Sequence, residues 1–232
     1  MNSMNFSSLI HSATYYLSYQ NKIGRDFMID ESTLKYPIAD YLTSLKIPSS
    51  KIKLEFSHPE LMTRYIDLVV YDNTKKRIET AFEFKIAKST TKYNAENKRI
   101  FNDLMRLYLI AKSFKSECYF LIAGTQSNFI QNFRSIVSTK PTIDNNDLPN
   151  PIGFYSKWFN FRVGSELTFE VKNEDEEQYE MIYNAFLSDY KPKKDGNALE
   201  LPKFIKTKCV AISALSRDFP TPYVGAIWKI YF

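Results

Sequence analysis

Residues 64–87 read RYIDLVVYDNTKKRIETAFEFKIA, and this stretch decides the fold. Two runs rich in β-branched and aromatic residues, 64–71 and 77–87, flank the polar sequence DNTKK, which is typical of a turn. We therefore predict two strands that pair as neighbours. A third short run with strand character, 51–56, precedes them, so a three-stranded meander is the simplest arrangement.

Three ionisable residues of these strands, Asp67, Glu83 and Lys85, can converge on one site. Asp67 lies in an apolar strand, where an unpaired ionised carboxylate would cost several kcal/mol. Residues 82–86, FEFKI, alternate strictly, so Glu83 and Lys85 point to one face and the apolar side chains to the other. If the two strands pair, Asp67 approaches Glu83 closely enough for both carboxylates to bind one hard cation. Lys85 could then hold a water or offset charge on a phosphate in the transition state.

Apolar spacing predicts two helices before these strands, over residues 6–20 and from an Asp30 cap to Leu45. Pro37 requires the second helix to begin near Tyr36 or to bend. The remaining predicted elements are a long helix at 94–114, a strand buried on both faces at 118–123, a loop at 139–153, strands at 158–163, 167–171, 204–214 and 224–232, and a helix at 174–190. The fold class is therefore α/β, with residues 1–138 as the core and 139–232 as a C-terminal elaboration packed on the same domain.

The order of elements, with Asp67, fifteen further residues and then Glu83-Phe84-Lys85, resembles the PD-(D/E)XK nuclease superfamily, the restriction-endonuclease-like fold. The resemblance implies an αβββαβ mixed sheet flanked by helices, with a C-terminal α+β extension. It also implies a Mg²⁺-dependent phosphodiesterase in which Mn²⁺ substitutes. Asp67, Glu83 and the Phe84 carbonyl match its metal ligands, and Lys85 matches its catalytic lysine.

Members of this superfamily often place a glutamate on an early helix facing the site, and Glu31 is the best match by position. A plain acid at a helix N-terminus also explains Glu31. The chain departs from the motif at Ile66, where the superfamily name expects proline. The resemblance covers about residues 25–125, and the second half of the chain matches no family pattern.

The basic residues are concentrated after the motif. The segment from Lys85 to Lys115 holds eight basic and two acidic residues, a local charge of +6 in a chain whose net charge is +5. Such a segment is either a solvated helix face or a surface for a polyanion. As the nucleic-acid-binding set we predict Lys88, Lys92, Lys98, Arg99 and Arg106.

Composition excludes several other classes. The chain has only two histidines, His11 and His58, which are few for catalysis by a histidine base and for a His-rich metal site. Its two cysteines are far apart in the sequence, which excludes a disulfide framework. The sequence has no apolar run of about 20 residues and no signal-peptide pattern, so we expect a cytoplasmic protein without a membrane partner.

The sequence therefore favours a Mg²⁺-dependent nuclease that hydrolyses DNA phosphodiester bonds, with Asp67, Glu83, Lys85 and Glu31 at the catalytic site. The alternative is a catalytically silent module of the same fold that binds nucleic acid or a protein. The motif residues could also be a structural cross-strand charge network worth about 0.2–1 kcal/mol per pair. The sequence leaves open whether the chain forms a homodimer.

Overall fold

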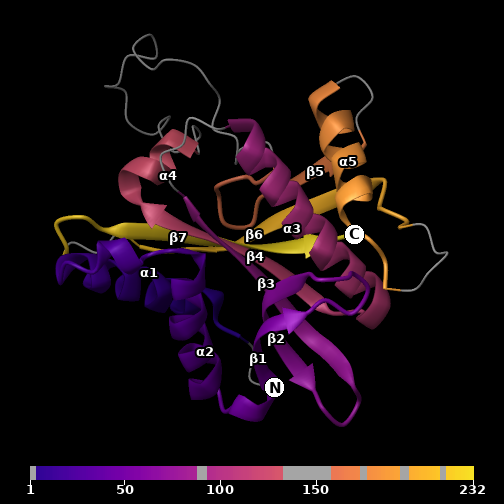
Figure 1. Ribbon diagram of the computed structural model, residues 1–232. Coiled ribbons are helices and arrows are strands. Elements are labelled where there is room, and N and C mark those ends of the chain that lie inside the picture. Colours follow the sequence, from indigo (N-terminus) through magenta and orange to yellow (C-terminus); the bar gives the residue numbers. More distant parts are fainter. Residues whose placement is uncertain (1–3, 88–92, 133–157, 173–176, 194–198, 215–217) are drawn as a thin grey trace.

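The computed structural model describes residues 4–87, 93–132, 158–172, 177–193, 199–214 and 218–232. Its centre is a seven-stranded mixed sheet in the order β1-β2-β3-β4-β7-β6-β5 (Figure 1). The strands are β1 (Ile52–Ser57), β2 (Tyr65–Asp72), β3 (Arg77–Ala87), β4 (Glu117–Thr125), β5 (Glu166–Glu170), β6 (Phe204–Ile212) and β7 (Tyr223–Tyr231). Only β3 and β4 run parallel among the pairs of this sheet.

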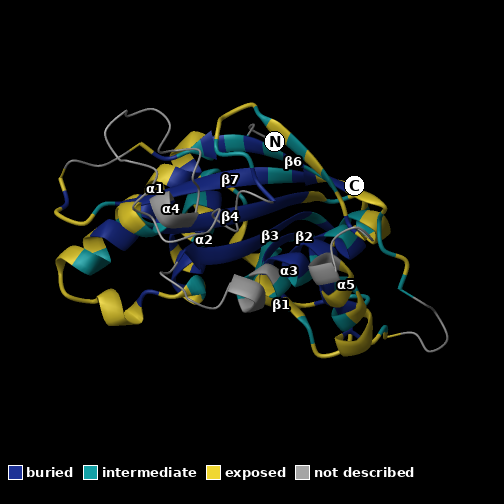
Figure 2. Cartoon of the chain, turned by 90° about the horizontal axis from the view of Figure 1, so that it is seen from above, coloured by how far each residue is buried: buried dark blue, intermediate teal, exposed yellow. Residues whose placement is uncertain are grey.

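Helices cover both faces of the sheet (Figure 1). The helices are α1 (Phe6–Lys22), α2 (Lys35–Ser44), α3 (Tyr93–Phe114), α4 (Gln126–Asn132) and α5 (Glu177–Asp189), with the 3-10 turns η1 (Asp26–Met28), η2 (Glu31–Leu34) and η3 (Ser49–Lys51). One apolar core joins the sheet to α1 and α2, and a second core joins the other face to α3, α4 and α5. The central strands β3, β4 and β7 are consequently the most deeply buried part of the molecule (Figure 2).

The meander predicted for residues 51–87 is confirmed. β1 pairs with β2 and β2 pairs with β3, both antiparallel, and the second register places Leu68 opposite Phe82. The long helix follows as α3, and β4 is buried along almost its whole length, as its continuous apolar run predicts. The first half of the chain thus has the predicted order of elements.

The second predicted helix is divided at its start. Asp30 accepts a hydrogen bond from the Thr33 N–H at 3.1 Å and caps the turn η2, and α2 begins at Lys35. Pro37 lies in the first turn of α2, where its missing N–H leaves no backbone acceptor unsatisfied. The helix therefore begins near Tyr36, as one of the two interpretations of Pro37 requires.

The prediction of a strand at 158–163 is wrong. These residues form irregular backbone, with Trp158 and Phe159 buried in the core between the sheet and its helices and Val163 58% exposed. Their carbonyls bond side chains instead of a neighbouring strand: Trp158 O accepts from Thr207 Oγ1 and Asn160 O accepts from Trp228 Nε1. The buried aromatic residues therefore gave this segment the composition of a strand, although its backbone pairs with no neighbouring strand. α4, which directly follows β4, was not predicted.

The C-terminal strands continue the same sheet, because β7 pairs with β4 over eight positions and β6 pairs with β7. The predicted boundary at 138/139 and the loop at 139–153 lie outside the described residues. None of the helices in the described ranges is long and apolar enough to span a bilayer.

Candidate active site

Asp67 lies on β2 next to the middle of β3. The register that pairs Leu68 with Phe82 brings Asp67 level with Glu83 at the next position. The Phe84 N–H donates a hydrogen bond of 2.8 Å to Asp67 Oδ2. Asp67 thus has a backbone partner, which offsets part of the penalty of placing a carboxylate in an apolar strand.

Glu83 and Lys85 point together toward α3, whereas the intervening phenylalanines and Ile86 join the core under α1 and α2. This is the alternation predicted from residues 82–86. On α3, Arg106 Nε lies 2.9 Å from Glu83 Oε1, and Asp103 Oδ2 lies 2.9 Å from Lys85 Nζ. A further ion pair of 2.6 Å joins Arg106 to Asp103, so four alternating charges link β3 to α3.

Glu31 reaches the same cluster from the turn η2. Both of its carboxylate oxygens lie 3.2 Å from Lys85 Nζ. The Glu31 side chain is 42% exposed and the Lys85 side chain only 6%, so Glu31 stands between the buried lysine and solvent. The early acidic residue that the sequence selected by position therefore contacts the motif lysine.

Lys35 and Glu55 complete the cluster, and sequence reasoning did not select either of them. Lys35 Nζ lies 3.3 Å from Asp67 Oδ1 and forms an ion pair with Glu55. Glu55 has a positive φ of 47° and lies on β1 between Leu54 and Phe56, which pair with Leu68 and Ile66, so it stands beside Asp67. A carboxylate in an apolar strand indicates that a cation must lie near Asp67, but helical periodicity could not identify Lys35 as that cation.

Acidic groups outnumber basic groups in the cluster even when Glu55, whose side chain is 59% exposed, is left out. Four carboxylates, those of Glu31, Asp67, Glu83 and Asp103, face three cations, Lys35, Lys85 and Arg106. Burial raises the pKa of Glu83 well above its usual value despite the contact with Arg106. Burial likewise raises the pKa of Glu31, against the opposing effect of Lys85. Protonation of Glu83 or the binding of a further cation would each relieve this excess of carboxylates.

Lys85 remains charged in this environment. Burial by itself would lower its pKa, but the carboxylates of Asp103 and Glu31 outweigh burial and raise the pKa above its ordinary value. Two carboxylates, those of Asp103 and Glu31, thus hold the ammonium group of Lys85 in place.

The basic residues predicted to bind nucleic acid lie in different settings. Lys98 forms an ion pair of 2.8 Å with Asp189 at the end of α5, and Arg99 lies 3.4 Å from Glu96 on the exposed side of α3. Arg106 is part of the charge cluster and is largely buried. Lys88 and Lys92 lie outside the described residues.

A buried histidine, His58, contacts the backbone of the helix that supplies Arg106 to the cluster. His58 is fully buried, and its Nε2 lies 3.1 Å from the Arg106 carbonyl, so this nitrogen carries the proton and donates. Its Nδ1 accepts from the N–H groups of Glu60 and Leu61, each at 3.1 Å. His58 therefore ties the loop before β2 to the turn of α3 that supplies Arg106.

Among the described residues, no group of three or more His, Cys, Asp or Glu side chains has an arrangement that would hold a metal ion as it stands. The cluster carboxylates are instead engaged by Arg106, Lys35 and Lys85. Comparison of the chain with protein-family models, with curated proteins and with solved structures found no match in any of the three.

Proposed function

We propose that this chain is a metal-dependent nuclease with a restriction-endonuclease-like core, and that it hydrolyses DNA phosphodiester bonds. The observation that carries the proposal is the convergence of Glu31, Asp67, Glu83 and Lys85, from a turn and two paired strands, in one charged cluster. The residues of the D-(X)n-E-X-K pattern, which are separated in the sequence, therefore lie in one cluster in the structure.

The donor set suits Mg²⁺ by its chemistry. Mg²⁺ prefers hard oxygen ligands and is usually held by one or two carboxylates. Asp67 and Glu83 would supply carboxylate oxygens and Phe84 its carbonyl oxygen. The excess of carboxylates over cations in the cluster supports a cation at this place. When bound, the metal would supply a water of lowered pKa and would neutralise charge on the phosphate.

The side chains around that position have separate roles in the proposal. Lys85 holds a phosphate oxygen or the attacking water, since its ammonium is held by Asp103 and Glu31. Glu31 is, after Glu55, the most exposed acid of the cluster, and in the proposal it lies where substrate would approach. Arg106 and Asp103 orient Glu83 and Lys85 from α3.

Two contacts favour a second candidate, a catalytically silent module that binds nucleic acid or a protein. Arg106 Nε lies 2.9 Å from Glu83 Oε1, and Lys35 Nζ lies 3.3 Å from Asp67 Oδ1. Cations of the protein itself thus already contact both proposed metal ligands. In this candidate the cluster stabilises the fold and needs no metal.

Calorimetric titration with Mn²⁺ and cleavage of labelled single-stranded and duplex DNA in Mg²⁺ distinguish the two candidates. The wild type should bind Mn²⁺ and cleave. Lys85→Met should lose cleavage but keep most metal affinity, and Glu83→Gln should lose both. Glu180→Gln, which changes an exposed glutamate on α5, is the matched control. A folded wild type that neither binds Mn²⁺ nor cleaves DNA would establish the silent module, and wild-type cleavage by Glu83→Gln would exclude this site.

A further inference from the structure

A second feature, distant from the charge cluster, combines lysines with exposed aromatic rings. An open groove of about 780 Å³ lies where the C-terminal end of α3 meets the start of β4, the end of β7 and the start of β6. We call it the basic aromatic groove, and its members used below are Lys112, Lys115, Lys203, Lys229, Phe204, Tyr231 and Phe232. None of these residues takes part in the charge cluster.

The groove carries a net positive charge. Lys112 is paired with Glu200 at 2.7 Å and Lys229 with Glu117 at 2.6 Å. Within the described part of the chain, Lys115 and Lys203 have no carboxylate within 4 Å. Exposed pairs of this kind are weak and open easily to another anion. The groove therefore offers both free and loosely held ammonium groups.

The sheet beside the groove places like charges together. Lys208 on β6 lies directly opposite Lys229 on β7, and Lys206 lies opposite Tyr231. Like charges at directly opposed positions destabilise a sheet. Glu166 contacts both Lys206 and Lys208, at 3.3 Å and 3.2 Å, so one carboxylate serves two ammonium groups. An external anion would relieve this repulsion.

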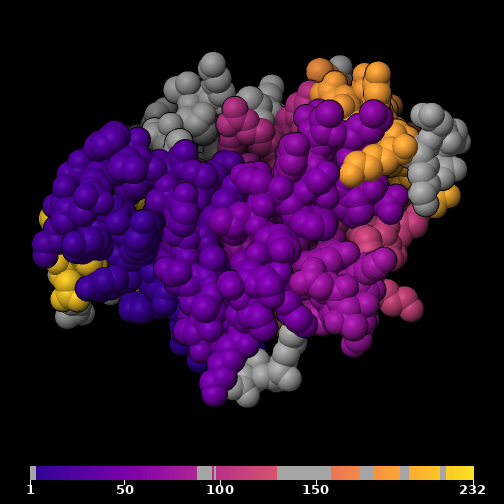
Figure 3. All heavy atoms as spheres, turned by 60° about the horizontal axis from the view of Figure 1, so that its bottom comes forward, coloured from indigo at the N-terminus to yellow at the C-terminus, as the bar shows by residue number. Residues whose placement is uncertain are grey.

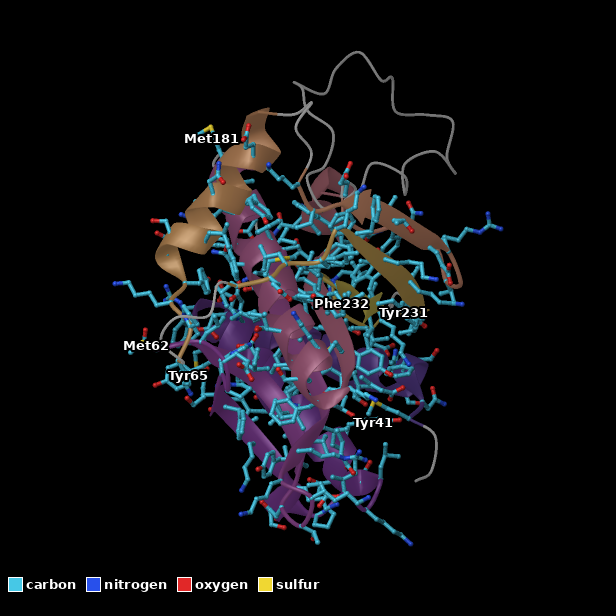
Figure 4. All side chains as sticks on the ribbon, turned by 90° about the vertical axis from the view of Figure 1, so that its right-hand side faces the viewer. Tyr41, Met62, Tyr65, Met181, Tyr231 and Phe232 are labelled. Atoms are coloured by element: carbon cyan, nitrogen blue, oxygen red, sulfur yellow. The ribbon has the colours of Figure 1, made fainter. Side chains whose placement is uncertain are left out.

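Three aromatic rings are exposed in the same place. Phe204, Tyr231 and Phe232 have exposed fractions of 49%, 36% and 41%. Lys203 lies 5.2 Å from the ring centre of Phe204, and Lys206 lies 5.1 Å from that of Tyr231. Figure 4 shows Tyr231 and Phe232 together at the end of β7. Ammonium groups and exposed aromatic rings thus lie side by side in the groove.

We propose that the basic aromatic groove binds single-stranded nucleic acid, with phosphates on the lysines and bases stacked on Phe204, Tyr231 or Phe232. A duplex offers phosphates, but its base faces are already stacked and cannot use the rings. A single strand offers both phosphates and exposed base faces. An apolar protein partner would leave the ammonium groups without anions, so it fits less well.

The groove is separate from the charge cluster but on the same sheet. Glu117, which lines the groove, lies opposite Thr80 of β3. Lys85 follows Thr80 by five residues on β3, which corresponds to about 17 Å along that strand. β7 is two strands from β3, about 10 Å across the sheet. One strand of nucleic acid could therefore contact both places, although binding in the groove requires no cleavage.

The test is fluorescence anisotropy of a labelled 12-nucleotide oligo-dT, with oligo-rU and a 12-base-pair duplex as comparison probes, in EDTA and across a salt series. EDTA removes any metal-dependent cleavage, so the result is independent of the proposed nuclease activity. The charge variant is Lys112→Gln/Lys115→Gln/Lys203→Gln. Its matched control, Lys22→Gln/Lys46→Gln/Lys53→Gln, removes the same charge near α1, α2 and β1.

The charge variant should weaken oligo-dT binding at least tenfold and lower the log-log salt slope by about 2, since each lost single-strand phosphate contact removes about 0.7. The control triple should change neither as strongly. Phe204→Ala/Phe232→Ala should weaken binding about tenfold without changing the slope, because stacking is not ionic. Phe27→Ala, at an 81% exposed ring on η1, is the aromatic control.

Equal affinities for the groove and control variants would overturn the proposal, as would duplex binding as tight as single-strand binding. A groove variant that changes only the oligomeric state in sedimentation would assign the rings to contact with a second copy instead. Comparable binding of oligo-rU supports the proposal for single strands in general, and binding of oligo-dT alone restricts it to DNA.

Discussion

Arg106 Nε on α3 lies 2.9 Å from Glu83 Oε1 on β3, with the Glu83 side chain almost completely buried. This contact joins the long helix to the centre of the sheet at the position where the motif glutamate stands. Removing one partner of a buried pair leaves an uncompensated charge, whereas an exposed pair contributes little. The pair is therefore expected to control stability and to orient Glu83.

Arg106→Met should lower the free energy of unfolding by about 3–5 kcal/mol, because Glu83 then loses its cation in a buried setting. Arg99→Met is the matched control, seven residues earlier on α3, with a side chain that is 68% exposed. Its effect should stay within about 0.5 kcal/mol. Urea unfolding measures both. Glu83→Gln added to Arg106→Met should recover part of the loss, and equal effects of the two arginine variants would contradict the prediction.

His58 gives the fold a dependence on pH. Burial lowers the pKa of His58 to about 4, and the ordinary value in an unfolded chain is about 6.5. Below the unfolded pKa, the unfolded chain binds a proton that the folded protein excludes. Stability from the neutral ring is thus complete above about pH 6.5 and is lost as the pH falls toward 4, by up to about 3 kcal/mol.

His58→Asn retains an oxygen that can accept from the N–H groups of Glu60 and Leu61 but does not titrate. Unfolding free energies measured from pH 7.5 to 4.5 should fall more steeply in the wild type than in this variant. Parallel curves for the two proteins would exclude His58 as the source of the slope.

The meander and the alternation around Glu83 could be predicted because short-range pattern determines them. Residues 64–87 contain two apolar runs and a turn, and the period of a strand then fixes which side chains share a face. Lys35 could not be predicted, because its contact with Asp67 depends on how α2 packs against the sheet. The contact of Asp103 with Lys85 likewise depends on the placement of α3 against the sheet.

The N-terminal helices show the same division between local and tertiary information. The spacing of apolar residues predicts α1 and α2 as helices. It does not predict that they lie beside β1–β3 and form one surface with these strands (Figure 3). The strand predicted at 158–163 failed for a related reason. Trp158 and Phe159 are apolar because they fill the core, and no pairing partner was required. Periodicity reports burial reliably, whereas the hydrogen-bonding partners depend on the whole fold.

Gly124 permits the close approach of β4 to β3 at the C-terminal end of the motif strand. It lies opposite Ala87 in the parallel register, and a Cβ there would lie 2.7 Å from the Ala87 carbonyl oxygen. Because the obstructing atom is backbone, relief requires the strands to move apart. Gly124→Ala should therefore destabilise the protein by about 1–3 kcal/mol in thermal or urea unfolding.

The same added Cβ would lie 2.8 Å from the Ala87 Cβ. Gly124→Ala/Ala87→Gly removes that contact but keeps the carbonyl contact, so it should recover only part of the stability. A Gly124→Ala variant as stable as the wild type would show that β3 and β4 can separate freely at this point.

Asp103 sets the charge state of Lys85. Since the Asp103 carboxylate lies 2.9 Å from Lys85 Nζ and contributes to raising its pKa, Asp103→Asn should lower the pKa of this buried lysine. Titration of ¹³Cε-labelled lysines by NMR measures the change directly. Asp189→Asn is the matched control, because it removes the partner of Lys98 at the surface, where solvent screens the charge.

The sign of this shift has a consequence for the proposed nuclease. A lysine stabilises charge on a phosphate only while it is protonated, so a lower pKa moves the loss of activity on the alkaline side toward neutral pH. Asp103→Asn should shift that limb of the rate profile and Asp189→Asn should not. If Lys85 titrates in Asp103→Asn as it does in the wild type, the carboxylate on α3 does not set the charge of the motif lysine, and Glu31 alone must do so.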